Sequence, residues 1–84
     1  MRLALAEDSA LLRAGLVELL GSRGHEVDIA VDNAADLLAA VVGAEDGDRP
    51  DVVILDNRMP PTFTDEGIQA AIALRRRHPG IGVL

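Results

Sequence analysis

The chain has 84 residues, of which fourteen are acidic and eight are basic, and its formal net charge is −6. A chain of this length forms one domain at most, and a charge of this sign opposes binding to a phosphate backbone. The sequence has one Phe and no Trp, Tyr or Cys, which excludes aromatic platforms for single-stranded nucleic acid, disulfides and thiolate metal sites.

The first apolar run, residues 2–6 (RLALA), has the length of a short strand and ends at two acids, Glu7 and Asp8. These acids end the apolar run too early for it to be a signal peptide. No later apolar run is long enough to span a membrane. We therefore expect a soluble cytoplasmic protein with no membrane contact and with a core of Leu, Val, Ile and Ala.

Residues 9–23 show the period of a helix, with leucines at positions 12, 16, 19 and 20 on one face. Apolar residues at this spacing form a stripe that packs on a core, so we expect these leucines to be buried. Asp8 or Ser9 can cap the first turn. Gly24 is a suitable stop for the helix.

A strand and a second helix follow. Residues 25–31 (HEVDIAV) place Val27, Ile29 and Val31 at every second position, which is typical of an edge strand with one wet face. Asn33 can cap the next helix, which extends to Gly43.

The remaining elements begin after a polar loop, residues 43–50. Residues 51–55 (DVVIL) are apolar after the first position, as in the central strands of parallel sheets. Residues 65–78 predict a third helix, and residues 81–84 (IGVL) begin another apolar run.

Strands that alternate with helices in this way indicate right-handed crossovers and a parallel sheet covered on both faces. The predicted order is strand, helix, strand, helix, strand, helix and the start of a fourth strand, in one domain over residues 1–84. A parallel strand that stops after four residues, with no helix after it, looks like a truncation.

Three carboxylates follow strands of this predicted sheet: Glu7 and Asp8 after the first strand, and Asp56 after the third. Sites in parallel sheets form beyond the carboxyl ends of the strands, so the three acids meet if these strands are neighbours. Two unit charges about 4 Å apart repel by about 4 kcal/mol at an effective dielectric near 20, so the cluster needs a cation or a change in protonation. Oxygen ligands of this kind suit Mg²⁺, and an aspartate beside the ion can attack a phosphoryl group.

The acid pair, Asp56 after an apolar strand, and Met59 and Pro60 three and four positions later together resemble the receiver domain of two-component response regulators. The resemblance implies a flavodoxin-like doubly wound parallel α/β sheet. It also implies that Asp56 is the phosphoacceptor.

By the same resemblance, a magnesium ion would be bound by the side chains of Glu7, Asp8 and Asp56 and by the backbone carbonyl of Arg58. The ion would neutralise charge on the entering phosphoryl oxygens. The phosphoryl donor would be a sensor histidine kinase, and the domain would be a signalling module and not an enzyme, with autophosphatase activity at most.

Pro60 would shape the loop after the phosphoacceptor, and Gly67 would lie at the start of the third helix. The spacing between these two residues is longer than in the commonest receivers and is similar to that in a subset of NarL/LuxR-type transcription regulators. Such regulators bind DNA through a helix-turn-helix output domain, which these 84 residues do not include. We therefore expect no direct nucleic acid binding by this chain.

The chain also departs from the receiver pattern. Receivers place a Ser or Thr after the fourth strand and a Lys after the fifth, but this chain stops before either position and contains no Lys. The fourth helix, the fifth strand and the fifth helix of a receiver would be missing, so the fold would be incomplete. We expect phosphotransfer by this chain to be weak or absent.

Without those elements, the fourth strand becomes an open edge, and the first helix and one face of the sheet lose their cover. We therefore expect a homo-oligomer that forms by strand pairing or through the first helix and the sheet face.

Two other functions stay open. The chain could be a structural or dimerisation fragment whose acids bind nothing. The chain could also be a phosphatase of the haloacid dehalogenase type, which uses an aspartate after a parallel strand. That group requires a second Asp two residues later, where this chain has Arg58.

Overall fold

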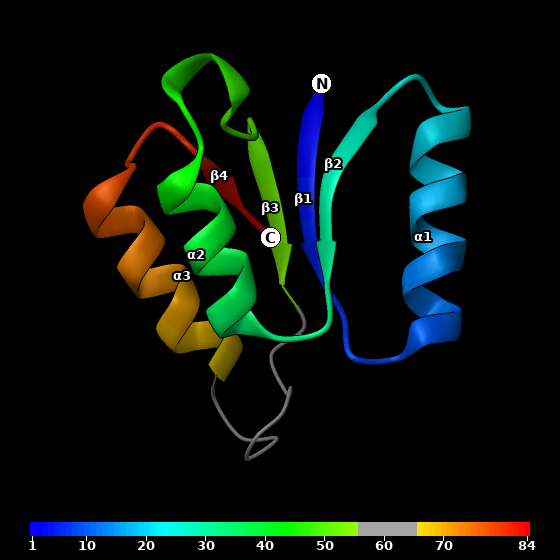
Figure 1. Ribbon diagram of the computed structural model, residues 1–84, viewed down its shortest axis with the longest axis horizontal. Helices are drawn as coiled ribbons and strands as arrows, with labels where there is room; N and C mark the ends of the chain where they lie inside the picture. Colours follow the sequence, from blue (N-terminus) through cyan, green and yellow to red (C-terminus); the bar gives the residue numbers. More distant parts are fainter. Residues whose placement is uncertain (56–65) are drawn as a thin grey trace.

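The computed structural model describes residues 1–55 and 66–84. Strands and helices alternate in this part of the chain, as the sequence predicts (Figure 1). In chain order the elements are β1 (Arg2–Ala6), α1 (Ala10–Ser22), β2 (Glu26–Val31), α2 (Ala34–Gly43), the 3₁₀ turn η1 (Asp46–Asp48), β3 (Val52–Leu55), α3 (Glu66–Arg77) and β4 (Gly82–Val83).

The strands form one parallel sheet in the order β2-β1-β3-β4. This order matches the first four positions of the flavodoxin-like order 2-1-3-4-5, so the predicted fold class is confirmed. The pairing of β1 with β3 runs from Leu3 opposite Val52 to Ala6 opposite Leu55. Because the strands are parallel, their carboxyl ends lie at one edge of the sheet (Figure 1).

The helices lie on both faces of the sheet, with α1 on one side and α2 and α3 on the other (Figure 1). The main core lies between the sheet and the pair α2 and α3. Small residues on β1 let the large side chains of the helices approach the sheet closely. The buried members of this core are Ala4, Ala6, Ala34, Leu37, Val41, Val53, Ala70, Leu74 and Ile81.

The edge strand β2 shows the predicted alternation. Val27, Ile29 and Val31 are half-buried, whereas the residues between them are exposed. Ile29 and Val31 pack against the core beneath α2, so one face of this strand is wet, as its period of two predicts.

Helix α1 differs from its prediction. None of its residues is buried. Of the four leucines expected to face the core, Leu16 and Leu20 are half-buried, but Leu12 and Leu19 are each 51% exposed. The expectation from periodicity that all four are buried is therefore wrong, whereas the exposure of Leu12 and Leu19 agrees with the prediction that part of α1 lacks cover. The helix contacts mainly the edge strand β2.

The ends of α1 and α2 follow the capping signals. The Ser9 hydroxyl accepts from the Leu12 N–H at 3.2 Å, and the Asn33 carboxamide oxygen accepts from the Asp36 N–H at 2.8 Å. Each bond satisfies a donor that the first helical turn leaves free. Gly24 has φ of 87°, a left-handed conformation that glycine adopts without steric cost and that ends a helix.

In the part of the chain that the structure describes, none of the helices has both the length and the apolar character needed to cross a lipid bilayer.

The core beneath α2 gives the first prediction. Replacing the fully buried Leu37 by Ala (Leu37→Ala) is expected to lower the free energy of unfolding by about 2–5 kcal/mol, because it leaves a cavity in an aliphatic core. Urea unfolding of dilute protein measures this. Leu11→Ala is the matched control, because Leu11 is 87% exposed and should change stability by no more than about 0.5 kcal/mol. Equal losses for the two variants would contradict the assigned core.

Candidate functional site

Two of the predicted site residues lie side by side at the carboxyl edge of the sheet. Glu7 and Asp8 come directly after Ala6, the last residue of β1. Ala6 pairs with Leu55, the last residue of β3, so the predicted neighbourhood of these two strands is confirmed. Glu7 is 7% exposed, whereas Asp8 is exposed. The pair therefore has one buried and one open carboxylate.

Glu7 is held through both its backbone and its side chain. Its N–H donates to the Val31 carbonyl at 3.0 Å, which continues the pairing with β2 beyond the end of β1. Its carboxylate Oε2 accepts from the Ser9 N–H at 3.0 Å. Its carbonyl accepts from Arg13 Nη1 at 2.9 Å. A buried acid needs such partners, because burial without hydrogen bonds penalises the charged form.

The turn between β1 and α1 explains this geometry. Ser9 caps α1 with its hydroxyl and meets Glu7 with its backbone N–H. The carboxylate of Glu7 therefore lies near the N-terminal end of a helix, where the free N–H groups and the helix dipole favour negative charge. The local sequence thus supports the fold and orients an acid at the same time.

Asp8 has a different environment. Within residues 1–55 and 66–84, its side chain makes no hydrogen bond or ion pair. An exposed carboxylate beside a buried one offers hard oxygen donors to a divalent ion such as Mg²⁺, which binds through one or two carboxylates and retains water in its other positions. The two acids therefore fit part of a magnesium site.

The other predicted site residues lie outside the described part of the chain. These are Asp56, Arg58, Met59 and Pro60. Gly67 is the second residue of α3, in agreement with the prediction that it lies at the start of that helix. Among the described residues alone, no three His, Cys, Asp or Glu side chains are grouped closely enough to hold a metal ion.

Other acids have structural partners at the opposite end of the sheet. Arg2 lies 3.1 Å from Asp28 and 3.5 Å from Asp48, and its backbone N–H donates to Asp51 at 2.9 Å. These acids belong to the fold near the start of β1. The Asp48 side chain stays exposed, so its ion pair with Arg2 is solvated.

Arg13 is a site residue that the sequence analysis missed. It lies in the first turns of α1, is half-buried and reaches back to the Glu7 carbonyl. A cation within reach of an acid pair in the first turns of a helix is the signal that could have found it, because helix dipoles disfavour a cation there unless it has a local partner.

Comparison with known proteins identifies the class. The family model described as "Response regulator receiver domain" matches residues 3–84. The chain therefore belongs to the receiver domain family of two-component response regulators, as the acid pair and the strand order indicate. This class is a signalling module.

Individual relatives agree with this assignment. The chain is 42% identical over 80 residues to the transcriptional regulatory protein PdtaR of Mycobacterium tuberculosis, in strains CDC 1551 / Oshkosh and ATCC 25618 / H37Rv. The match covers 93% of this chain but only 36% of PdtaR, so the chain spans about a third of the length of these relatives.

A solved structure shares the fold. It is the crystal structure of histidine kinase ThkA in complex with response regulator protein TrrA, with a TM-score of 0.79 and 27% sequence identity. The match covers 98% of this chain and 64% of the chain in that structure.

The Arg13 contact gives the second prediction. Arg13→Ala is expected to lower the free energy of unfolding by about 1–3 kcal/mol, because it removes a charged donor to the Glu7 carbonyl in a part-buried turn. Urea unfolding measures the change. Arg23→Ala, at the exposed end of the same helix, serves as the control and should stay within about 0.5 kcal/mol of wild type. If both variants lose the same stability, the contact does not hold the turn.

Proposed function

We propose that Asp56 is the phosphoacceptor of this receiver domain. The supporting observation is the register of β1 and β3, in which Ala6 lies opposite Leu55. Glu7 follows the first of these residues in the sequence and Asp56 follows the second. Parallel neighbours direct the residues after their last pair toward the same edge of the sheet, which supports a site shared by the acids.

We propose that the site binds Mg²⁺ through Glu7, Asp8, Asp56 and the backbone carbonyl of Arg58. The exposed carboxylate of Asp8 and the buried carboxylate of Glu7 provide the donor chemistry. When bound, the ion supplies positive charge that stabilises the oxygens of the transferring phosphoryl group.

The proposed reaction is phosphoryl transfer from a phosphohistidine to Asp56. A carboxylate oxygen of Asp56 forms the new O–P bond, and the N–P bond of the phosphohistidine breaks. The imidazole leaves with the electron pair and takes up a proton. Autophosphatase activity would be hydrolysis of the acyl phosphate by water, which returns Asp56 and releases inorganic phosphate.

The partner is proposed to be a sensor histidine kinase, and the place of action the cytoplasm. The solved structure that shares this fold is a complex of a histidine kinase with a response regulator protein, which supports the first assignment. The proposal of the cytoplasm rests on the same partner, the histidine kinase.

The downstream role is proposed to be control of transcription. The relatives named PdtaR are transcriptional regulatory proteins, and the spacing between Pro60 and Gly67 is similar to that of a NarL/LuxR-type subset. Binding to DNA would use parts of the protein beyond these 84 residues. The chain itself has a net charge of −6, which does not favour contact with DNA.

Helix α1 exposes large apolar residues, since Leu11 is 87% exposed and Leu12 and Leu19 are each 51% exposed. Such surfaces favour self-association, so a homo-oligomer through α1, the sheet face or the β4 edge is proposed.

Magnesium binding gives the third prediction. At a Mg²⁺ concentration ten times its dissociation constant, the wild-type chain should gain about 1.4 kcal/mol of stability, because the ion binds the folded state. Asp8→Asn should lose this gain. Glu45→Gln is the matched control, since it removes the charge of an exposed acid in the loop after α2 and should keep it. Thermal unfolding with and without Mg²⁺ measures the gain, and an equal response of both variants would exclude the proposed site.

The phosphoacceptor assignment gives the fourth prediction. With Mg²⁺, wild type is expected to form a complex with beryllofluoride, a phosphoryl mimic, and to become labelled by acetyl phosphate. Asp56→Asn should do neither, because its side chain lacks the nucleophilic oxygen, and Glu45→Gln should behave as wild type. Fluorine NMR and intact mass spectrometry are the measurements. Labelling of Asp56→Asn at the wild-type rate would refute the assignment.

A further inference from the structure

The turn between β1 and α1 holds the backbone of Asp8 from both sides and leaves its carboxylate free. Before Asp8, the Glu7 N–H donates to the Val31 carbonyl at 3.0 Å. After Asp8, the Ser9 N–H donates to Glu7 Oε2 at 3.0 Å, and the Ser9 hydroxyl caps α1. The side chain of Asp8 is exposed. The fold therefore fixes where this side chain begins and leaves its oxygens open to a ligand.

Arg13 adds a contact to this turn from further along the chain. Its Nη1 donates to the Glu7 carbonyl at 2.9 Å. The Glu7 carbonyl and the N–H and Cα of Asp8 belong to one planar peptide unit, so a bond to that oxygen sets the orientation from which the Asp8 side chain departs. Arg13 is half-buried, and its planar guanidinium loses little freedom when it forms such a bond.

The charge of Arg13 alone would act on a metal ion in the opposite direction. Within the described residues, its guanidinium has no acid as a partner in an ion pair. A cation bonded to the backbone of an acid pair repels a divalent cation, so its removal should strengthen metal binding. Loss of the orientation of a ligand should weaken metal binding instead. The two effects differ in sign, and an experiment can therefore separate them.

We propose that Arg13 is a positioning residue for Mg²⁺, because it holds the peptide between Glu7 and Asp8 in the orientation that presents the Asp8 carboxylate to the ion. This inference rests on the magnesium site proposed above. Arg13 is not a ligand, since a guanidinium has no acceptor atom. It acts as the hydrogen-bond partners of metal ligands generally do, whose loss weakens metal affinity by about 10- to 100-fold.

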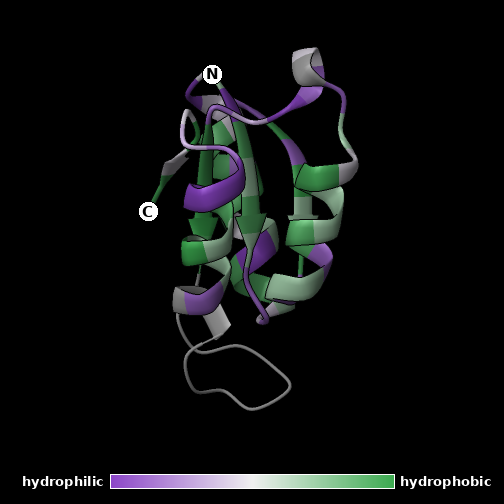
Figure 2. Ribbon diagram, turned by 90° about the vertical axis from the view of Figure 1, so that its left-hand side faces the viewer, coloured by the Kyte–Doolittle hydropathy of each residue, from purple (hydrophilic) through white to green (hydrophobic). Residues whose placement is uncertain are grey.

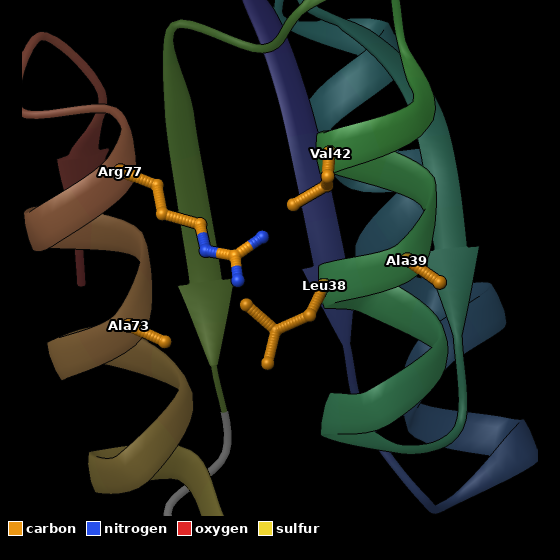
Figure 3. Close-up of a pocket in the computed structure, with 5 residues that line it drawn as sticks. All are labelled: Leu38, Ala39, Val42, Ala73 and Arg77. Carbon is orange, nitrogen blue, oxygen red and sulfur yellow. The ribbon is translucent and has the colours of Figure 1, made fainter.

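Arg77 is the matched control, because it is a second arginine whose side chain reaches toward a neighbouring element. It belongs to the last turn of α3, which is hydrophilic beside the largely hydrophobic α2 (Figure 2). This turn lies at the amino edge of the sheet, away from the acid pair (Figure 1). The side chain extends from α3 toward α2 along a groove whose other lining residues are Leu38, Ala39, Val42 and Ala73 (Figure 3).

The main test is the Mg²⁺ dissociation constant, followed by NMR titration at a temperature where circular dichroism shows that every variant is folded. Arg13→Met should weaken binding about tenfold, although it removes a positive charge. Arg77→Met removes the same charge and should bind as wild type does. Arg13→Lys should fall between wild type and Arg13→Met, because its ammonium can still donate to the carbonyl but lacks the planar guanidinium. Arg13→Leu replaces Arg13→Met if that variant does not fold.

A measurement without metal tests the same contact. In wild type, backbone amide relaxation by NMR should give Asp8 an order parameter near the rigid value of about 0.85. In Arg13→Met the value should fall toward about 0.6, which is typical of a flexible backbone, and in Arg77→Met it should not change. A flexible Asp8 amide in wild type, or an unchanged one in Arg13→Met, would overturn the positioning role.

The outcomes distinguish the positioning role from the magnesium site itself. A wild type that does not bind Mg²⁺ overturns both. Binding by wild type that Arg13→Met leaves unchanged or makes tighter overturns the positioning role alone, because the charge of Arg13 would then be its main effect. Equal weakening by Arg13→Met and Arg77→Met also overturns it. If Arg13→Lys and Arg13→Met lose the same affinity, the hydrogen bond to the carbonyl is not the cause, and the positioning role is again overturned.

Discussion

The pairing of β1 with β3 is the constraint on which the rest of the structure depends. β1 lies between two strands and has no free edge, so its backbone groups are satisfied on both sides. Its last four residues are all buried. This central position fixes the end of β1 from both sides, and Glu7 follows directly. A site that must hold charged groups in fixed positions gains from such an anchor.

Burial of Glu7 makes this anchor costly unless its polar groups have partners. The chain meets that need locally, since the Ser9 N–H contacts the carboxylate and Arg13 contacts the carbonyl. Both partners come from the start of α1, so the helix and the acid stabilise each other. Asp8, one residue further, escapes this network and stays exposed. The two adjacent side chains therefore differ in how they are held: hydrogen bonds fix Glu7, whereas Asp8 is exposed to solvent.

Much of the fold could be predicted because its signals are local or periodic. The alternation in β2 and the caps Ser9 and Asn33 depend on near neighbours, and the structure confirms each of them. The position of Glu7 and Asp8 could be predicted because parallel strands end at one edge. Periodicity alone could not predict the exposure of Leu12 and Leu19, because it shows that a helix has an apolar face but not how much of the sheet lies beneath it; the expectation that part of α1 lacks cover came from the receiver resemblance. Arg13 was missed because its partner is a backbone carbonyl, so its signal in the sequence is only a cation in the first turns of a helix that follows two acids.

The two faces of the sheet differ in how completely they bury apolar side chains. Under α2 and α3, small alanines on β1 admit Leu37, Val41 and Leu74 to full burial. On the other face, α1 contacts mainly the edge strand β2 and leaves Leu11, Leu12 and Leu19 exposed. The helix whose start holds Glu7 therefore also carries exposed leucines. Arg13 and Ser9 connect the start of α1 to Glu7. The exposed face of α1 and the acids at the end of β1 therefore share one helix, which is in contact with both solvent and the candidate site.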